Sequence, residues 1–359
     1  MFPEVIDVMV AAMHDYYGNP SSIHAQGRKA KAAVEVARKK IATLLGCSVG
    51  EIFITSGGSE ANNTALKGAV LDLGLRTIIT TKIEHPCVLR SIEHLAQIVP
   101  LDIHYLDTDA TGRVNKDHLK EILSRNPKGS IVSIMHANNE VGTMNNIEEL
   151  GLICTEYGAL FHSDTVQTIG HFDFPLAETH LHFASASAHK FHGPKGIGLL
   201  YLKGAQIKPL IDGGGQERNI RAGTENVASI IGMAKALDLY FANMENYERK
   251  TRSIRDYARE EIQRNFPGVK INGDVDGASL YTVLSITFPG NSVSDLLVFN
   301  LDIEGISASG GSACSSGVQK VSHVLAALDP EDTGTTVRLS FSPLNDLSEI
   351  EKKKKKLKK

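Results

Sequence analysis

The sequence contains no apolar run long enough to cross a bilayer, and its first residues lack the basic-then-apolar pattern of a signal peptide. It also lacks internal repeats and Pro- or Ser-rich linkers. A net charge of −3 provides no overall field that would recruit nucleic acid. The few cysteines are widely separated, without the close spacing of metal ligands. We therefore expect a cytoplasmic protein with reduced thiols, no membrane partner and no direct nucleic-acid binding. These cysteines are Cys47, Cys87, Cys154 and Cys314.

Up to about residue 247, short apolar strands alternate with helical stretches, which predicts an α/β domain with a mostly parallel sheet. Ligands then bind beyond the carboxyl ends of the strands. A charged helix, a Gly/Ser loop and a further strand follow, which indicates a smaller α+β domain. We predict a large domain at 15–247 and a small domain formed by 1–14 and 248–359. Strands are expected at 77–80, 102–106, 131–135, 160–164, 181–185 and 196–202. Helices are expected at 3–17, 28–45, 115–125, 147–158, 249–265 and 293–300.

The stretch "TSGGSEANN" (55–63) joins a predicted strand to a predicted helix. Its glycines allow close backbone approach to a ligand, and the helix start offers unpaired N–H groups to a phosphate, with the Ser59 hydroxyl beside them. A tight turn capped by Ser59 explains the same residues. A nucleotide P-loop is not expected, because no Gly-Lys-Ser/Thr follows.

Two further residues follow predicted neighbouring strands. Asp164 ends "LFHSD", and Lys190 lies in "SASAHKFHGPKGIG" (185–198). Pyridoxal phosphate enzymes need such a pair, because the lysine forms a Schiff base and the carboxylate keeps the pyridine nitrogen protonated. A helix cap at Asp164 and a solvated charge at Lys190 are the simpler interpretations. The combination with a phosphate-binding turn favours the cofactor.

Several longer motifs identify the chain as similar to the cysteine desulfurases, in the fold-type I pyridoxal phosphate superfamily (aminotransferase class V). This resemblance implies a mostly parallel seven-stranded sheet, and a smaller α+β domain that carries the catalytic cysteine loop. The matching stretches are "YGNPSSIH", "FITSGGSEANN", "EHPCVL", "SIMHANNEVGT", "HSDTVQTIG", "SASAHKFHGPKGIGLLY", "GGGQERNIRAGTENV" and "GGSACSSG".

The resemblance implies that pyridoxal 5′-phosphate binds covalently to Lys190, with Asp164 on its ring nitrogen. It implies that His85 stacks on the ring and moves protons, and that Gln167 bonds the phenolic oxygen. Thr224 would reach the phosphate in the other subunit of a homodimer. The other residues implied to bind the cofactor are Gly58, Ser59, Asn139, Ser187 and His189.

The implied reaction converts L-cysteine to L-alanine. Asn19, Asn139 and Arg338 would bind the substrate, Arg338 through its carboxylate. Cys314, in a Gly-rich loop, would attack the substrate sulfur as a thiolate and keep it as a persulfide. The sulfur then passes to an iron–sulfur scaffold, a sulfur carrier or a tRNA-thiolation enzyme.

Other functions remain open at this point. A class V aminotransferase or a selenocysteine lyase is the nearest alternative, although an aminotransferase needs no thiol at 314. A catalytically silent sulfur-carrier or scaffold subunit is another. No metal site is predicted, because "HLH" (180–182) and "HKFH" (189–192) have no second ligand cluster. Family members begin with a strand-like segment that precedes the first residue here, and the end "EKKKKKLKK" has little apolar face. We therefore expect either truncation or an imperfect sequence assignment at both ends.

Overall fold

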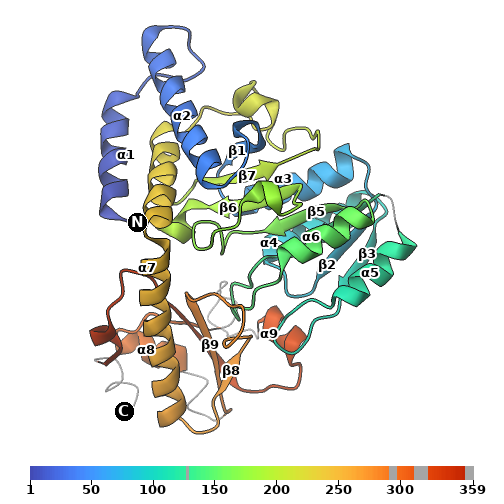
Figure 1. Ribbon diagram of the computed structural model, residues 1–359, viewed down its shortest axis with the longest axis vertical. Helices are drawn as coiled ribbons and strands as arrows, with labels where there is room; N and C mark the ends of the chain where they lie inside the picture. Colours follow the sequence, from blue (N-terminus) through green and yellow to red (C-terminus); the bar gives the residue numbers. More distant parts are fainter. Residues whose placement is uncertain (127–128, 291–296, 311–321, 352–359) are drawn as a thin grey trace. The chain divides into compact units, whose positions relative to one another are not determined.

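The computed structural model describes residues 1–126, 129–290, 297–310 and 322–351 (Figure 1). The chain forms two compact units. Unit 1 comprises Met1–Leu106, Lys116–His136 and Asn146–Met244, and unit 2 comprises Asp107–Asn115, Ala137–Asn145 and Glu245–Lys359. Among the described helices, none has the length and apolar character that crossing a membrane requires.

Unit 1 is built on a seven-stranded sheet in the order β1-β7-β6-β5-β4-β2-β3. The pairs among β6, β5, β4, β2 and β3 are parallel, whereas β7 is antiparallel to both of its neighbours. The predicted α/β class with a mostly parallel sheet is therefore confirmed. The strands are β1 (Ile52–Thr55), β2 (Thr77–Thr81), β3 (Asp102–Leu106), β4 (Ser130–Ser133), β5 (Leu160–Asp164), β6 (Phe183–Ser187) and β7 (Gly198–Leu202).

Helix α3 illustrates how helices of unit 1 bury an apolar face against this sheet. In α3 the buried positions recur at helical spacing, and the helix packs on β6 and β7 and against α4. Its buried residues are Gly58, Ala61, Asn62, Thr64, Ala65 and Leu66. The other helices are α1 (Pro3–Asp15), α2 (Ala25–Leu44), α4 (Pro86–Ile98), α5 (Lys116–Arg125) and α6 (Ile147–Glu156), with α3 at Gly58–Lys67.

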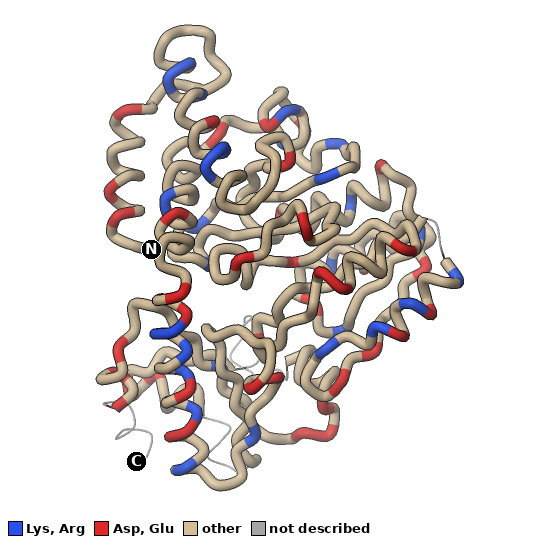
Figure 2. Tube along the Cα trace, in the orientation of Figure 1, with Lys and Arg blue, Asp and Glu red and all other residues tan. Residues whose placement is uncertain are grey.

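Helix α7 (Val227–Asn265) is a single 39-residue helix, whereas the sequence predicted a separate helix at 249–265. The prediction was wrong about the start, because no glycine or proline interrupts the helix after Gly232. Opposite charges alternate along residues 245–265 (Figure 2) and form pairs such as Glu248 with Arg252, 2.6 Å apart. The change in composition near 247 therefore marks a change of surface along one helix.

Unit 2 contains an antiparallel four-stranded sheet in the order β10-β11-β9-β8. A core of Ile254, Ala258, Leu284, Ile286 and Phe341 joins α7 residues to this sheet. The strands are β8 (Lys270–Asn272), β9 (Val283–Phe288), β10 (Ser309–Gly310) and β11 (Thr335–Ser340), and the helices are α8 (Leu297–Ile303) and α9 (His323–Leu328). The first residues of the helix predicted at 293–300 lie outside the described residues.

The N-terminal helix belongs to unit 1, although the sequence placed residues 1–14 in the small domain. Phe2 is 4% exposed, stacks on His192 with ring centroids 4.6 Å apart, and lies near Tyr240. These aromatic contacts with unit 1 fix the helix there. The boundaries 15–247 and 248–359, as domain limits, stay a prediction.

A buried ion pair covers the free edge of β1. Arg38 and Glu217 are 3% and 6% exposed, and their side chains meet in two hydrogen bonds of 2.7 Å. Glu217 also accepts a hydrogen bond from the Ile54 N–H, and Arg38 donates to the Ile52 carbonyl. The pair thus satisfies edge groups that would otherwise invite another strand. It also holds residues 217–219 in left-handed conformations, with φ of 44°, 55° and 67°.

We expect Glu217→Gln to lower the free energy of unfolding by about 3–5 kcal/mol, because it leaves the Arg38 charge buried without its partner. Urea unfolding followed by circular dichroism measures this effect. Glu121→Gln is the control, since Glu121 pairs with Arg125 on the surface and should change stability by less than about 1 kcal/mol. Equal effects of the two substitutions would contradict the assignment.

Candidate functional site

The turn between β1 and α3 brings Gly58 against the end of β6. The Gly58 N–H donates to the Ser187 Oγ at 2.7 Å. A Cβ at position 58 would lie 2.4 Å from the Val166 Cγ2, so only glycine fits. Ser59, at the first turn of α3, is exposed. The turn therefore presents a helix N-terminus and hydroxyl groups at one place, which is the arrangement that binds phosphate.

Asp164 ends β5 and is 5% exposed. Its Oδ2 accepts a hydrogen bond of 2.7 Å from Asn62 Nδ2, and its Oδ1 accepts one of 3.0 Å from the Val166 N–H. Asp164 pairs in register with Ser185 of β6, whose hydroxyl donates to Oδ1 at 3.5 Å. The carboxylate is thus held at the carboxyl edge of the sheet by donors from β6, from α3 and from the turn after β5.

Asp164 belongs to a series of hydrogen-bonded polar side chains that the sequence did not reveal. Asn62 Oδ1 lies 3.0 Å from His162 Nε2, and His162 Nδ1 lies 2.8 Å from the Ser133 hydroxyl. Burial lowers the pKa of His162 to about 3, so its ring is neutral. A neutral ring donates from Nε2 to Asn62 and accepts at Nδ1 from Ser133. The spacing of buried positions in α3 places Asn62 inward, and this was the available signal.

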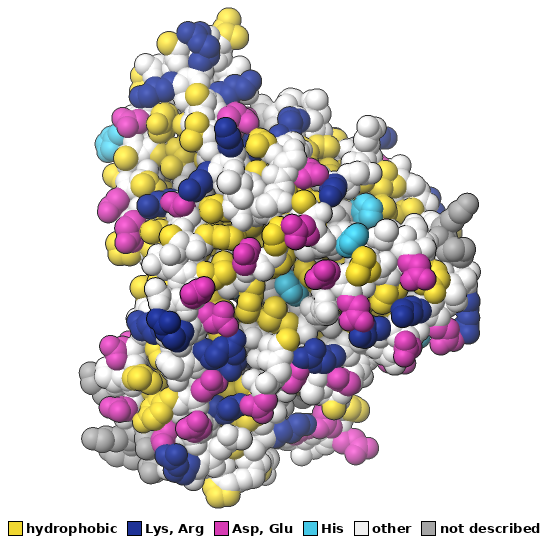
Figure 3. Space-filling view, in the orientation of Figure 1, with side chains coloured by type: hydrophobic (Ala, Val, Ile, Leu, Met, Phe, Trp, Pro, Cys, Tyr) yellow, Lys and Arg dark blue, Asp and Glu magenta, His cyan; other side chains and the backbone are white. Residues whose placement is uncertain are grey.

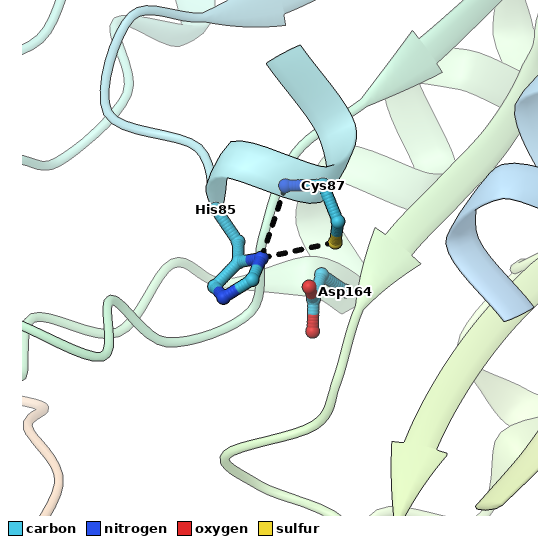
Figure 4. Close-up of side chains that lie close together, drawn as sticks. All are labelled: His85, Cys87 and Asp164. Atoms are coloured by element: carbon cyan, nitrogen blue, oxygen red, sulfur yellow. Dashed lines mark hydrogen bonds between the residues drawn. The ribbon is translucent and has the colours of Figure 1, made fainter. Parts of the chain in front are cut away.

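His85 caps the N-terminus of α4 and lies beside Asp164 (Figure 4). His85 Nδ1 accepts from the Cys87 N–H at 3.2 Å and lies 2.9 Å from Cys87 Sγ. Ligand-type atoms of His85, Cys87 and Asp164 all lie within 4.8 Å of one another. The structure therefore brings together two side chains predicted from the sequence and one that was not.

Lys190 lies in the short 3₁₀ turn Ala188–Phe191 that follows β6, with an exposed side chain. His171 Nε2 donates to the Lys190 carbonyl at 2.9 Å, and burial lowers the pKa of His171 to about 4. Burial and the neighbouring Lys190 and Lys195 charges also lower the pKa of His189. The histidine that holds the Lys190 backbone is therefore neutral.

The remaining predicted residues lie in several parts of the chain. In unit 1, Gln167 is half-buried just after β5, Thr224 is exposed, and Asn19 is exposed with its Oδ1 accepting from the Ser21 N–H. In unit 2, Arg338 Nη1 of β11 donates to the Asn139 carbonyl at 3.0 Å. Cys314 lies outside the described residues.

The three described thiols are poor nucleophiles. Burial raises the pKa of Cys47 to about 12, and burial together with the Asp164 charge raises that of Cys87 to about 11. Burial raises the pKa of Cys154 still further. Each thiol therefore stays protonated at neutral pH, which suits a packing role for these small side chains.

Comparisons with known proteins show which family the chain resembles. Residues 1–352 match the aminotransferase class-V family. The cysteine desulfurase IscS of Dictyoglomus turgidum is 44% identical over 91% of this chain and 82% of its own. A solved NifS-like protein has a TM-score of 0.89 at 35% identity and covers 100% of this chain and 95% of its own. SspA in complex with cysteine has a TM-score of 0.82 at 30% identity, with 96% and 97% covered.

The chain therefore belongs to the aminotransferase class-V family and, within it, to the cysteine desulfurases. The family and enzyme class predicted from the motifs are confirmed. The roles of individual residues stay predictions.

Glu84, next to His85, is a buried acid that the sequence did not single out. Its Oε1 accepts from the Met135 N–H at 2.7 Å and from the Thr81 hydroxyl at 3.3 Å. Burial and the nearby Asp164 charge raise the pKa of Glu84 to about 8. The folded protein therefore keeps a proton on Glu84 between about pH 4.3 and 8, where the unfolded chain loses it.

This proton makes stability fall as pH rises through that window, by about 1.4 kcal/mol per pH unit. Glu84→Gln removes the titration and keeps an oxygen acceptor. We expect the free energy of unfolding of the variant, minus that of the wild type, to grow from pH 5 to pH 8 in urea titrations. Exposed Glu93→Gln serves as the control. A difference that is independent of pH would contradict the raised pKa.

Proposed function

We propose that the protein converts L-cysteine to L-alanine with pyridoxal 5′-phosphate as its cofactor, and that Cys314 keeps the sulfur as a persulfide. The observation that carries this proposal is the edge formed by β5 and β6. There a buried carboxylate, Asp164, lies next to a histidine on one side, and the adjacent parallel strand leads into Lys190. The cysteine desulfurase relatives and the cysteine complex of SspA support the substrate.

The residues present fit the cofactor. The glycine turn at 58 excludes a side chain, and the N-terminus of α3 with Ser59 and Ser187 suits a phosphate. Asp164 is held by three donors, so it can keep a ring nitrogen protonated. His189, Gln167, Thr224 and Asn139 are the further residues proposed to bind the cofactor.

The cofactor supplies an electron-accepting ring that makes a proton on the substrate α-carbon acidic. Lys190 provides the amine that links the cofactor and then moves this proton. His85 moves a proton at the substrate sulfur. Arg338 holds the substrate carboxylate, and its hydrogen bond to the Asn139 carbonyl orients the guanidinium. Asn19 and Asn139 complete the proposed substrate contacts.

The proposed acceptor of the sulfur is the thiolate of Cys314. The thiolate of Cys314 attacks the sulfur of bound cysteine, the carbon–sulfur bond breaks, and a sulfur–sulfur bond forms. In net terms cysteine and a thiol become alanine and a persulfide, so no external oxidant is needed. Cys47, Cys87 and Cys154 have raised pKa values, which makes them unsuitable for this attack.

A homodimer belongs to this proposal, because Thr224 is assigned to the phosphate of the other subunit. Helix α1 supports an association surface. Ile6, Val10 and Met13 lie on one helical face and are 45%, 50% and 61% exposed, and apolar side chains appear over α1 in Figure 3. The proposed sulfur acceptors are an iron–sulfur scaffold, a sulfur carrier or a tRNA-thiolation enzyme, in the cytoplasm.

Two variants separate the proposed roles. We expect Lys190→Ala to lose both the covalently trapped cofactor after borohydride reduction and alanine formation, because no other amine takes its place. Lys195→Ala, in the same loop, should keep both. Cys314→Ser should keep the trapped cofactor and release no sulfide from cysteine. Mass spectrometry and alanine and sulfide assays measure these outcomes.

Normal trapping in Lys190→Ala would refute the lysine assignment. Full sulfide release by Cys314→Ser would refute the role of that thiol and would favour another class V reaction. A purified chain that takes up no pyridoxal phosphate would favour a silent scaffold subunit.

A further inference from the structure

The His85–Cys87–Asp164 cluster (Figure 4) combines an imidazole, a thiol and a carboxylate, whose ligand-type atoms lie within 4.8 Å of one another. This composition is found in zinc sites, which use nitrogen, sulfur and oxygen ligands together. Neither the sequence spacing nor the proposed reaction assigns a role to Cys87. The sequence does not indicate the cluster, because Asp164 is far from His85 and Cys87 along the chain and comes close to them only in the folded protein.

The three ligand-type atoms, all within 4.8 Å of one another, lie near enough for modest side-chain movements to form a tetrahedral metal site. Bond lengths of about 2.0–2.3 Å to nitrogen, oxygen and sulfur place neighbouring ligands roughly 3.3–3.8 Å apart. The contact of 2.9 Å between His85 Nδ1 and Cys87 Sγ has to open by less than about 1 Å to reach that range. Rotation of the Cys87 and Asp164 side chains provides adjustments of this size.

Asn62 holds both prospective anionic ligands. Its Nδ2 donates to Asp164 Oδ2 at 2.7 Å and to Cys87 Sγ at 3.3 Å, so its two amide hydrogens have two acceptors. Its Oδ1 is bound by neutral His162. Metal sites use such outer hydrogen bonds to orient their ligands. The cluster therefore has an orienting group as well as three ligand atoms.

We propose that the cofactor-free protein binds one thiophilic divalent cation, of the zinc type, at the His85–Cys87–Asp164 cluster. Metal binding displaces to solvent the proton that the Cys87 thiol otherwise keeps at neutral pH, and the thiolate, a ring nitrogen of His85 and a carboxylate oxygen of Asp164 donate to the metal. Water takes the fourth position, and nothing is oxidised or reduced. The thiolate and imidazole ligands select against Mg²⁺ and Ca²⁺, which prefer oxygen.

Metal and organic cofactor exclude one another in this proposal. Under the proposed function His85 and Asp164 contact the cofactor ring, so they cannot bind a cation at the same time. A soft metal ion would then block loading of newly made protein. The exclusion of the cofactor by the metal rests on the proposed function, whereas the binding of the metal to the cluster does not.

The test uses the full-length chain with Cys314→Ser, which removes a thiol outside the cluster, after its cofactor has been removed. Calorimetry with Zn²⁺ should give one site. Co²⁺ should give a thiolate-to-metal charge-transfer band, and Mg²⁺ should give no binding. Cys87→Ser and Cys87→Ala should each weaken Zn²⁺ binding at least about tenfold. Cys47→Ser, a half-buried thiol elsewhere in unit 1, should bind Zn²⁺ as before.

Circular dichroism checks that each variant is folded, and the Co²⁺ band decides the thiolate ligand even without the variants. Zinc bound equally by the Cys87 variants and by Cys47→Ser, or a Co²⁺ complex without the charge-transfer band, would overturn the site. In the second arm, one equivalent of Zn²⁺ should slow the return of the pyridoxal phosphate absorbance, and a chelator should restore it. Simultaneous binding would overturn the exclusion. A protein that takes up no pyridoxal phosphate without metal would contradict the proposed function, while the Zn²⁺ titration would still decide the site.

Discussion

The parallel pairing of β5 with β6 is the constraint on which the site depends, because it sets two strand ends side by side at one edge of the sheet. Asp164 ends one strand, and Ser187 with the turn that holds Lys190 follows the other. A shift of one residue in this pairing would move every side chain of the strand to the other face of the sheet, so the register decides where the Asp164 carboxylate lies.

A charge buried at such an edge requires complete hydrogen bonding. Asp164 receives donors from Asn62, Val166 and Ser185, and the chain continues through His162 to Ser133. Burial keeps the histidine neutral, so this chain orients the carboxylate without adding a competing charge. The same burial keeps Glu84 protonated beside it. Burial is the main cause of the raised pKa of Glu84, and the nearby Asp164 charge adds to it.

Glu60 connects the turn at Gly58 to the loop that carries Thr224. Glu60 Oε2 accepts from the Ser56 N–H, and its Oε1 accepts from Arg221 Nε at 3.0 Å. Although burial raises the pKa of Glu60, the bonds from Arg221 and Ser56 hold it below its usual value. The Arg38–Glu217 pair fixes the same loop to the edge of β1. Two ionic contacts therefore position a loop that has little apolar side chain to bury.

Local patterns in the sequence were sufficient for the α/β class, for the glycine turn, and for Asp164 and Lys190 as strand-end residues, because these follow from side-chain periodicity and chain order. The motifs added the family, and with it roles that periodicity does not contain. The sequence could not place helix α1, since Phe2 meets His192 and Tyr240 only in the folded chain. It could not show that α7 continues through residue 247, because surface charge changes there without any helix-breaking residue. Contacts between distant segments, such as Asn62 with Asp164 or Cys87 with both, were decided by the tertiary structure alone. Their physical cause is burial: polar groups brought together by the packing of apolar faces must find partners where the fold places them.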